Sequence, residues 1–147
     1  NRITSANCPA NRFISLFFCL LNGESGELAF CNAGHNPPIV VRADGTHELL
    51  RGAGPVLGIL SFIEYPEFHA KLEPGDTLVI YSDGVTEAVD AKGEEFGVEG
   101  LADVVARCGG MSSAEVIAEV NKALTVFTGS AHQADDTTLI VARRLAD

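Results

Sequence analysis

The hydrophobic pattern of this 147-residue chain changes from strand to helix spacing and then back again, and that order limits the fold to one class. Up to residue 82, short apolar runs bounded by turn signals such as NGESG and EPGD predict β-strands. The runs lie at residues 12–21, 27–33, 39–43, 65–72 and 77–82. Apolar residues then repeat at helical spacing over 98–108 and 112–127, and a last strand is predicted at 137–144. This order predicts an α+β fold with largely antiparallel sheet, in which the last strand returns to the earlier ones.

Two of these segments carry additional signals. Residues 12–21 (RFISLFFCLL) are nearly all apolar, so we expect a strand that is buried on both faces or nearly so. The helix over 112–127 begins with Ser112 and Glu115 at the spacing of a capping box. Gly129 follows its end, as is typical of a helix C-terminus.

Composition and charge exclude several classes of function. The net charge of −10 argues against nucleic acid or an anionic membrane surface as a partner. No apolar run in the sequence has the length needed to cross a bilayer. The four cysteines form no CxxC pair, and Cys19 and Cys31 stand inside apolar runs. We therefore expect buried free thiols and a reducing, cytoplasmic compartment.

Aspartates stand at the ends of two predicted strands. Asp83 follows the run 77–82, while Asp135 and Asp136 precede the strand at 137–144. If these strands are antiparallel neighbours, the carboxylates converge at one edge of the sheet and suit Mg²⁺ or Mn²⁺. Asp-Gly is also a common turn signal, so two turns at strand ends that never meet explain the pattern equally well. Spacing alone leaves both interpretations open.

Four longer motifs occur in one order from about Phe13 to Arg144. They are CNAGHNPPIVVRADGT, GPVLGI, LEPGDTLVIYSDGVTEAVDAKGEEFGVEGL and QADDTTLIVAR. In these motifs the chain resembles the bacterial SpoIIE-type branch of the metal-dependent protein phosphatases, the PPM or protein phosphatase 2C family. The resemblance implies a four-layer α-β-β-α sandwich that hydrolyses phosphoserine or phosphothreonine with metal-activated water. It also implies bacterial signalling in the cytoplasm, with a phosphorylated STAS-type anti-sigma-factor antagonist as the substrate.

The same resemblance assigns roles to residues near the predicted strand ends. Asp83 and Asp135 match family metal ligands, so we expect them to be catalytic and to bind Mn²⁺ or Mg²⁺, two ions in a complete site. Gly84 is expected to let the backbone pass close to the metal, and Asp136 to form a structural hydrogen bond. Glu87 is expected to support the site without binding the metal, with a solvated loop glutamate as the alternative.

His35 stands where the sequence differs from the broader phosphatase family. That family has a Gly-Asp-Ser-Arg turn in place of AGHN, and its aspartate helps to hold a third metal. With histidine at this position we expect a structural role, in which the imidazole bonds a neighbouring backbone carbonyl in the turn.

The first part of the family's domain has no counterpart in this sequence. An Asp-Val/Ser-Gly-His/Lys-Gly segment, whose aspartate bridges both metals, should precede the strand that begins at residue 12. Residues 1–12 resemble the tail of the helix that follows this segment. We therefore expect residues 1–147 to be a single, partial, N-terminally truncated domain that lacks its first strands and its first metal-ligand segment, and that follows an upstream sensory domain.

Truncation leads to three expectations and leaves one alternative function. Metal binding should be weak or absent in this fragment, and activity nearly lost. Exposed edges and apolar surface should favour self-association into a homodimer by exchange of strands. The alternative function is a pseudo-phosphatase or protein-interaction module that retains the fold. A calcium-binding module around DGVTEAVDAKGEE is disfavoured, because this stretch lacks the ligand spacing of an EF-hand loop.

Overall fold

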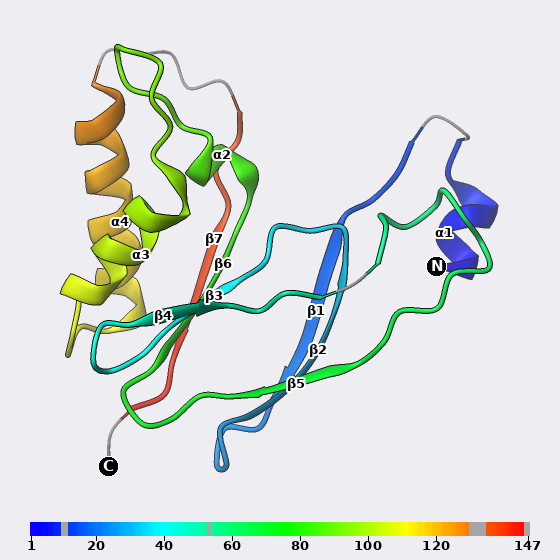
Figure 1. Cartoon of the computed structure of the whole chain (residues 1–147), viewed down its shortest axis with the longest axis horizontal. Coiled ribbons are helices and arrows are strands. Elements are labelled where there is room, and N and C mark those ends of the chain that lie inside the picture. Colours follow the sequence, from blue (N-terminus) through cyan, green and yellow to red (C-terminus); the bar gives the residue numbers. More distant parts are fainter. Residues whose placement is uncertain (10–11, 53, 130–134, 146–147) are drawn as a thin grey trace. The chain divides into compact units, whose positions relative to one another are not determined.

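The chain divides into two compact units in the computed structural model, which describes residues 1–9, 12–52, 54–129 and 135–145 (Figure 1). The first unit comprises residues 1–37 and 50–71, and the second comprises residues 38–49 and 72–147. Each unit contains one sheet, and every pairing between the described strands is antiparallel. The predicted α+β class with antiparallel sheets is therefore confirmed. The four-layer stacking and the truncation stay predictions.

The first unit is built on a three-stranded sheet in the order β1-β2-β5. Its strands are β1 (Leu16–Leu21), β2 (Glu27–Ala33) and β5 (Phe68–Lys71), and helix α1 (Arg2–Asn7) precedes them. The β1–β2 hairpin closes where the Asn22 side chain accepts the amides of Glu24 and Ser25, at 2.9 and 3.1 Å. Helix α1 confirms that the first residues of the chain are helical.

Strand β1 corrects the expectation of burial on both faces. Leu16, Phe18 and Leu20 are 41, 51 and 62% exposed. They alternate with Phe17, which lies on the opposite face and packs against Phe30 with 5.5 Å between ring centroids. Hydrophobicity predicted the strand correctly, but it does not reveal how many layers cover the sheet. In the described part of the chain, one face of β1 is apolar and open to solvent.

The second unit is a four-stranded sheet with two helices on one face (Figure 1). Its strands, in the order β4-β3-β6-β7, are β4 (His47–Leu49), β3 (Ile39–Val41), β6 (Thr77–Tyr81) and β7 (Leu139–Arg143). Helices α3 (Gly97–Arg107) and α4 (Ser113–Thr128) cover the sheet. Fully buried Val79, Leu101 and Val116 belong to the core that the sheet and helices share. The last strand therefore returns to the sheet as predicted, at its edge.

Helix α4 has the ends that its sequence predicts. The Ser112 hydroxyl accepts the Glu115 amide, and the Glu115 carboxylate accepts the Ser112 amide, so the capping box is complete. The Ser112 amide and hydroxyl both donate to the Glu115 carboxylate, and these bonds lower the pKa of that carboxyl. Gly129 ends the helix with a positive φ of 54°. None of the helices in the described ranges is both long and apolar enough to cross a membrane.

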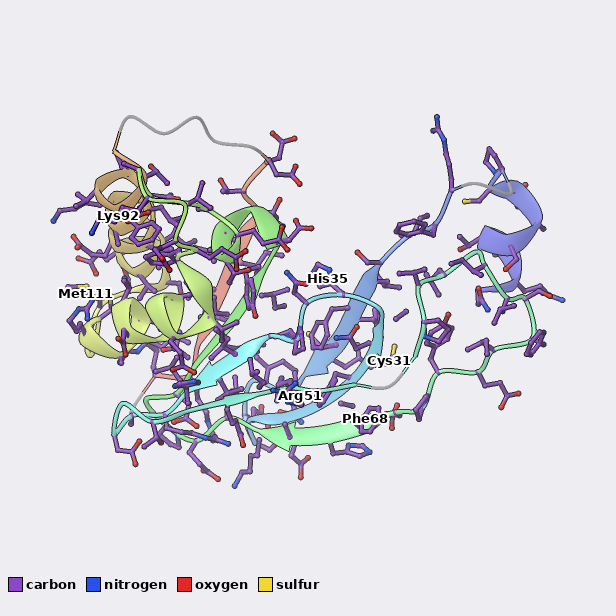
Figure 2. All side chains as sticks on the ribbon, turned by 45° about the horizontal axis from the view of Figure 1, so that its top comes forward. Cys31, His35, Arg51, Phe68, Lys92 and Met111 are labelled. Carbon is purple, nitrogen blue, oxygen red and sulfur yellow. The ribbon has the colours of Figure 1, made fainter. Side chains whose placement is uncertain are left out.

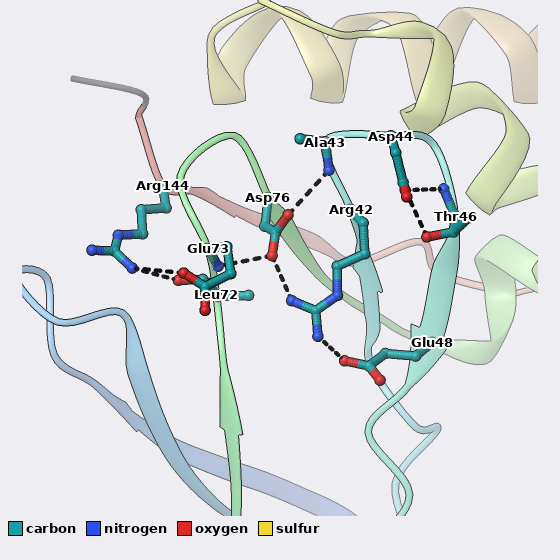
Figure 3. Close-up of polar contacts among 9 residues, drawn as sticks. All are labelled: Arg42, Ala43, Asp44, Thr46, Glu48, Leu72, Glu73, Asp76 and Arg144. Carbon is teal, nitrogen blue, oxygen red and sulfur yellow. Dashed lines mark hydrogen bonds and ion pairs between the residues drawn. The ribbon is translucent and has the colours of Figure 1, made fainter.

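Asp76 and Arg144 join three segments at the start of β6 (Figure 3). Asp76 is 2% exposed and accepts hydrogen bonds from the Arg42 guanidinium, the Ala43 amide (3.0 Å) and the Glu73 amide (2.8 Å). Arg144, directly after β7, donates its guanidinium to the Leu72 carbonyl at 2.7 Å and its amide to the Asp76 carbonyl at 3.0 Å. This polar cluster holds the turn before β6 against the β3–β4 hairpin and the end of β7.

Replacing Asp76 by alanine should strongly destabilise the fold. The substitution leaves the partly buried Arg42 and two backbone amides without their carboxylate, so we expect the free energy of unfolding to fall by about 3 kcal/mol. Urea denaturation measures this loss. The matched control is Glu48→Gln, which removes the exposed partner of the same arginine and should cost at most about 1 kcal/mol. Equal losses for both variants would contradict a special role for Asp76.

Candidate metal centre

The pairing of β6 with β7 brings the two predicted aspartate positions to the same end of the second sheet. The strands are antiparallel neighbours, and Tyr81 opposite Leu139 is their last pair. The chain leaves β6 towards Asp83 at the same end where it enters β7 from Asp135. Of the two interpretations that the sequence allowed, this arrangement supports convergence. The condition on which that interpretation depended, that the two strands are antiparallel neighbours, is met.

Ser82 ties the two chain segments together beyond the last strand pair. Its amide donates to the Thr138 carbonyl at 3.0 Å, and its hydroxyl accepts the Thr138 amide at 2.8 Å. The same hydroxyl donates to the Asp136 carbonyl at 3.1 Å. Sequence reasoning missed this residue, although a small hydroxyl residue between an apolar strand and Asp83 was a signal of a helix N-cap. Residues 82–84 and 135–138 thus form one junction, to which Asp136 contributes its backbone carbonyl.

Gly84 is required here because two backbones approach closely. A Cβ atom at this position would lie 2.4 Å from the Asp136 carbonyl oxygen and 3.3 Å from the carbonyl carbon of Asp135. Any larger residue would push the Asp135–Asp136 segment away from the end of β6. The glycine therefore allows Asp83 and Asp135 to lie on adjoining segments, which is a different reason from the predicted approach to a metal.

Asp83 is the first residue of a short helix that the sequence did not predict, α2 (Asp83–Thr86). Four residues that include glycine, valine and threonine are too few and too weakly helical to show a periodic pattern. Burial of Val85 and Thr86 anchors the helix to the second unit, while Asp83 stays exposed. Its Oδ1 atom accepts the Gly84 amide at 3.0 Å.

The Asp135 carboxylate makes the same local hydrogen bond as that of Asp83. Asp135 is also exposed, and its Oδ1 atom accepts the amide of the next residue, Asp136, at 2.7 Å. Oxygen donors on adjoining segments fit a hard divalent cation such as Mg²⁺ or Mn²⁺. Within the described ranges, however, no three or more His, Cys, Asp or Glu side chains come together as a complete set of ligands. Asp83 and Asp135 therefore fit part of a metal site.

The remaining predicted residues lie near this junction or in the other unit. Glu87 ends α2, is exposed, and donates its amide to the Asp83 carbonyl at 2.8 Å. His35 follows β2 in the first unit (Figure 2), where Asn32 bonds both its amide (2.8 Å) and its carbonyl (2.9 Å). Its imidazole Nδ1 lies 3.3 Å from the Ser15 hydroxyl, which takes the place of the expected backbone carbonyl. The described contacts of His35 are thus those of a turn residue.

Solved structures of known proteins share this fold. The PP2C phosphatase domain and a fragment of the regulatory domain of SpoIIE from Bacillus subtilis match 97% of this chain and 41% of that chain, with a TM-score of 0.79 at 20% identity. RsbX in complex with magnesium matches 95% of this chain and 60% of that chain, with a TM-score of 0.65 at 20% identity. The fold is therefore that of a PP2C phosphatase domain.

Sequence comparison identifies the family within this class. The family model for Stage II sporulation protein E (SpoIIE) matches residues 1–145, so the chain belongs to the SpoIIE family of PP2C-type serine/threonine phosphatases. Protein IcfG of Synechocystis is 29% identical over 90% of the chain, and phosphoserine phosphatase RsbU of Bacillus subtilis is 38% identical over 59%. The chain spans only 21% and 26% of the lengths of these two relatives.

A methyl group at position 84 should open the junction. We expect Gly84→Ala to lower the free energy of unfolding by about 2 kcal/mol, because its Cβ cannot fit against the Asp136 carbonyl. Gly109→Ala is the control, since a Cβ there meets nothing within 4 Å. Urea denaturation and the amide NMR shifts of residues 82–84 and 135–138 report the effect. An unchanged spectrum at residues 135–138 would show that the close approach is not needed.

Proposed function

We propose that this chain is part of a metal-dependent protein phosphatase that hydrolyses phosphoserine or phosphothreonine. The observation that carries the proposal is the junction at the ends of β6 and β7, where Ser82 and Gly84 hold the segments of Asp83 and Asp135 together. Membership of the SpoIIE family supports the reaction class. Both the catalytic and the metal-binding roles are proposed for Asp83 and Asp135.

The two aspartates act by holding positive charge at the sheet edge. Carboxylates that lie close together repel each other, and a cation between them relieves the repulsion. The Gly84 and Asp136 amides donate hydrogen bonds to these carboxylates and restrain their orientation before a cation binds. When bound, Mn²⁺ or Mg²⁺ supplies a water of lowered pKa and neutralises charge on the phosphoryl group. The exposure of both aspartates leaves the site open to a phosphorylated side chain of another protein.

The proposed substrate is a phosphorylated STAS-type anti-sigma-factor antagonist in the cytoplasm of a bacterium. Similarity to RsbU, a phosphoserine phosphatase, supports this choice. An upstream sensory domain is proposed as the source of regulation, in keeping with the small fraction of each curated relative that this chain spans. Neither nucleic acid nor a membrane surface is proposed as a partner, since the chain carries a net charge of −10.

A complete site needs ligands beyond Asp83 and Asp135. We propose that a preceding segment of the natural protein supplies the bridging aspartate for two metal ions. The 147-residue chain alone should then bind Mn²⁺ weakly and turn over substrate very slowly.

Phosphate release from a phosphoserine protein tests this function. In the natural protein that carries this sequence, we expect turnover that depends on Mn²⁺ and that Asp83→Asn or Asp135→Asn lowers at least about 100-fold, because each removes a ligand charge. Asp44→Asn, which alters an exposed turn carboxylate of the same unit, is the control and should retain full activity. The 147-residue chain should show almost no turnover of p-nitrophenyl phosphate.

Four results would contradict parts of this proposal. Turnover without a divalent metal, or turnover that survives both aspartate substitutions, would overturn the metal mechanism. Efficient Mn²⁺-dependent turnover by the 147-residue chain alone would overturn the need for a preceding ligand segment. A natural protein that binds the phosphoprotein but never dephosphorylates it would favour the pseudo-phosphatase.

A further inference from the structure

Residues 135–138 reach the junction beyond the end of the strand ladder. The last pair of β6 and β7 is Tyr81 with Leu139, so the segment that carries Asp135 lies outside the paired strands. All four residues of this segment are exposed to solvent. In the described part of the chain, Ser82 makes three hydrogen bonds with the segment, two of them through its hydroxyl. The Ser82 side chain thus continues the contact between the two strands after their ladder has ended.

The Ser82 hydroxyl forms two hydrogen bonds of opposite kinds at the same time. It accepts the Thr138 amide at 2.8 Å and donates its own hydrogen to the Asp136 carbonyl at 3.1 Å. A hydroxyl group can do both, whereas the methyl group of alanine can do neither. Because Asp136 and Thr138 are exposed, water can replace both bonds when the hydroxyl is removed. Loss of the hydroxyl should therefore cost little stability and mainly release the position of the segment.

The Asp136 carbonyl is held from two sides. The Ser82 hydroxyl donates to it, and Gly84 packs against it so closely that a Cβ atom would lie 2.4 Å from the oxygen. Asp136 directly follows Asp135, and Gly84 directly follows Asp83. The position of this one carbonyl therefore restrains the backbones of both proposed metal ligands relative to each other.

We propose that Ser82 is a positioning residue for metal binding, which holds the Asp135 segment in place before a cation binds. The inference rests on the proposed function, in which Asp83 and Asp135 share a divalent cation. Without this restraint a cation must also order the segment, and the lost conformational freedom weakens its binding. Both hydrogen bonds of the hydroxyl go to backbone groups, so Ser82 acts through Asp135 and is not itself assigned as a ligand.

Metal affinity and turnover separate this role from a catalytic one. Once a cation is bound, the ion itself links Asp83 to Asp135, and the Ser82 hydroxyl adds little. Ser82 thus sets the concentration of metal that fills the site, and not the rate of the filled site. A side chain that contacted the phosphoryl group or the reacting water would instead change the rate at saturating metal.

Titration with Mn²⁺, followed by broadening of amide NMR signals, tests the role on the whole 147-residue chain. We expect Ser82→Ala to raise the Mn²⁺ concentration that half-broadens residues 83–84 and 135–136 by roughly fivefold, the worth of about one hydrogen bond. Without metal, the Thr138 amide should exchange its hydrogen faster in this variant. Ser82→Thr keeps a hydroxyl and should restore both values.

Ser112→Ala is the matched control. The Ser112 hydroxyl also accepts a backbone amide, that of Glu115 at 3.3 Å, in the same unit of the chain. This variant loses the cap of α4, so in urea it should be destabilised at least as much as Ser82→Ala. It should nevertheless bind Mn²⁺ as the unchanged chain does. The comparison separates a loss of affinity through position from a loss through stability.

Phosphate release by the natural protein that carries this sequence gives a second readout. Ser82→Ala should raise the Mn²⁺ concentration for half-maximal turnover roughly fivefold. Turnover at saturating Mn²⁺ should change by less than about twofold, because the filled site is the same.

The possible outcomes distinguish the role of Ser82 from the proposed function. Broadening that never localises at residues 83–84 and 135–136 of the unchanged chain would overturn the shared metal site and the role of Ser82 with it. Localised broadening with equal Mn²⁺ affinity in Ser82→Ala would overturn the role of Ser82 alone. Equal weakening by Ser112→Ala would show that stability sets the affinity, and failure of Ser82→Thr to restore it would show that the hydroxyl is not the cause. A large fall in turnover at saturating Mn²⁺ would contradict a purely positioning role.

Discussion

The antiparallel pairing of β6 with β7 is the constraint on which the candidate site depends. It places the end of one strand beside the start of the other, so that two aspartates more than 50 positions apart in the chain reach one sheet edge. Ser82 extends this pairing past the last strand residues, and Gly84 permits the close approach. The geometry of the site is thus mainly a property of backbone pairing, and the aspartate side chains complete it.

The opposite end of the β6–β7 pair is also held by specific hydrogen bonds. Asp76 and Arg144 hold the turn before β6 and the end of β7 together, away from the aspartates. A slip of one residue in strand register turns every side chain to the other face of the sheet. Polar contacts at one end and Ser82 at the other therefore oppose such a slip, which would also separate the segments of Asp83 and Asp135. In this way the contacts of Asp76 and Arg144 support the strand pairing on which the proposed metal site depends.

Sequence patterns predicted the order and type of the larger elements, and the capping box located the start of α4 correctly. They left open whether the two aspartate-bounded strands are neighbours, which the pairing of β6 with β7 decides. Helix α2 was missed because one helical turn has no measurable period, and the contacts of Ser82 were missed because they depend on backbone geometry. The predicted burial of β1 on both faces was wrong, because an apolar strand has the same sequence pattern whether its sheet is covered on one face or on two. Family resemblance, and not periodicity, supplied the roles assigned to Asp83 and Asp135.

Asp83 and Asp135 are proposed to share a divalent cation at the junction of β6 and β7. Paramagnetic line broadening by Mn²⁺ in the amide NMR spectrum of this chain tests that claim most directly, because broadening acts only near the bound ion and needs no catalysis. We predict that the amides of residues 83–84 and 135–136 broaden first, and that Asp83→Asn removes the effect at both segments together. Broadening spread evenly over the acidic surface, or broadening at residues 135–136 that persists in Asp83→Asn, would contradict a shared site.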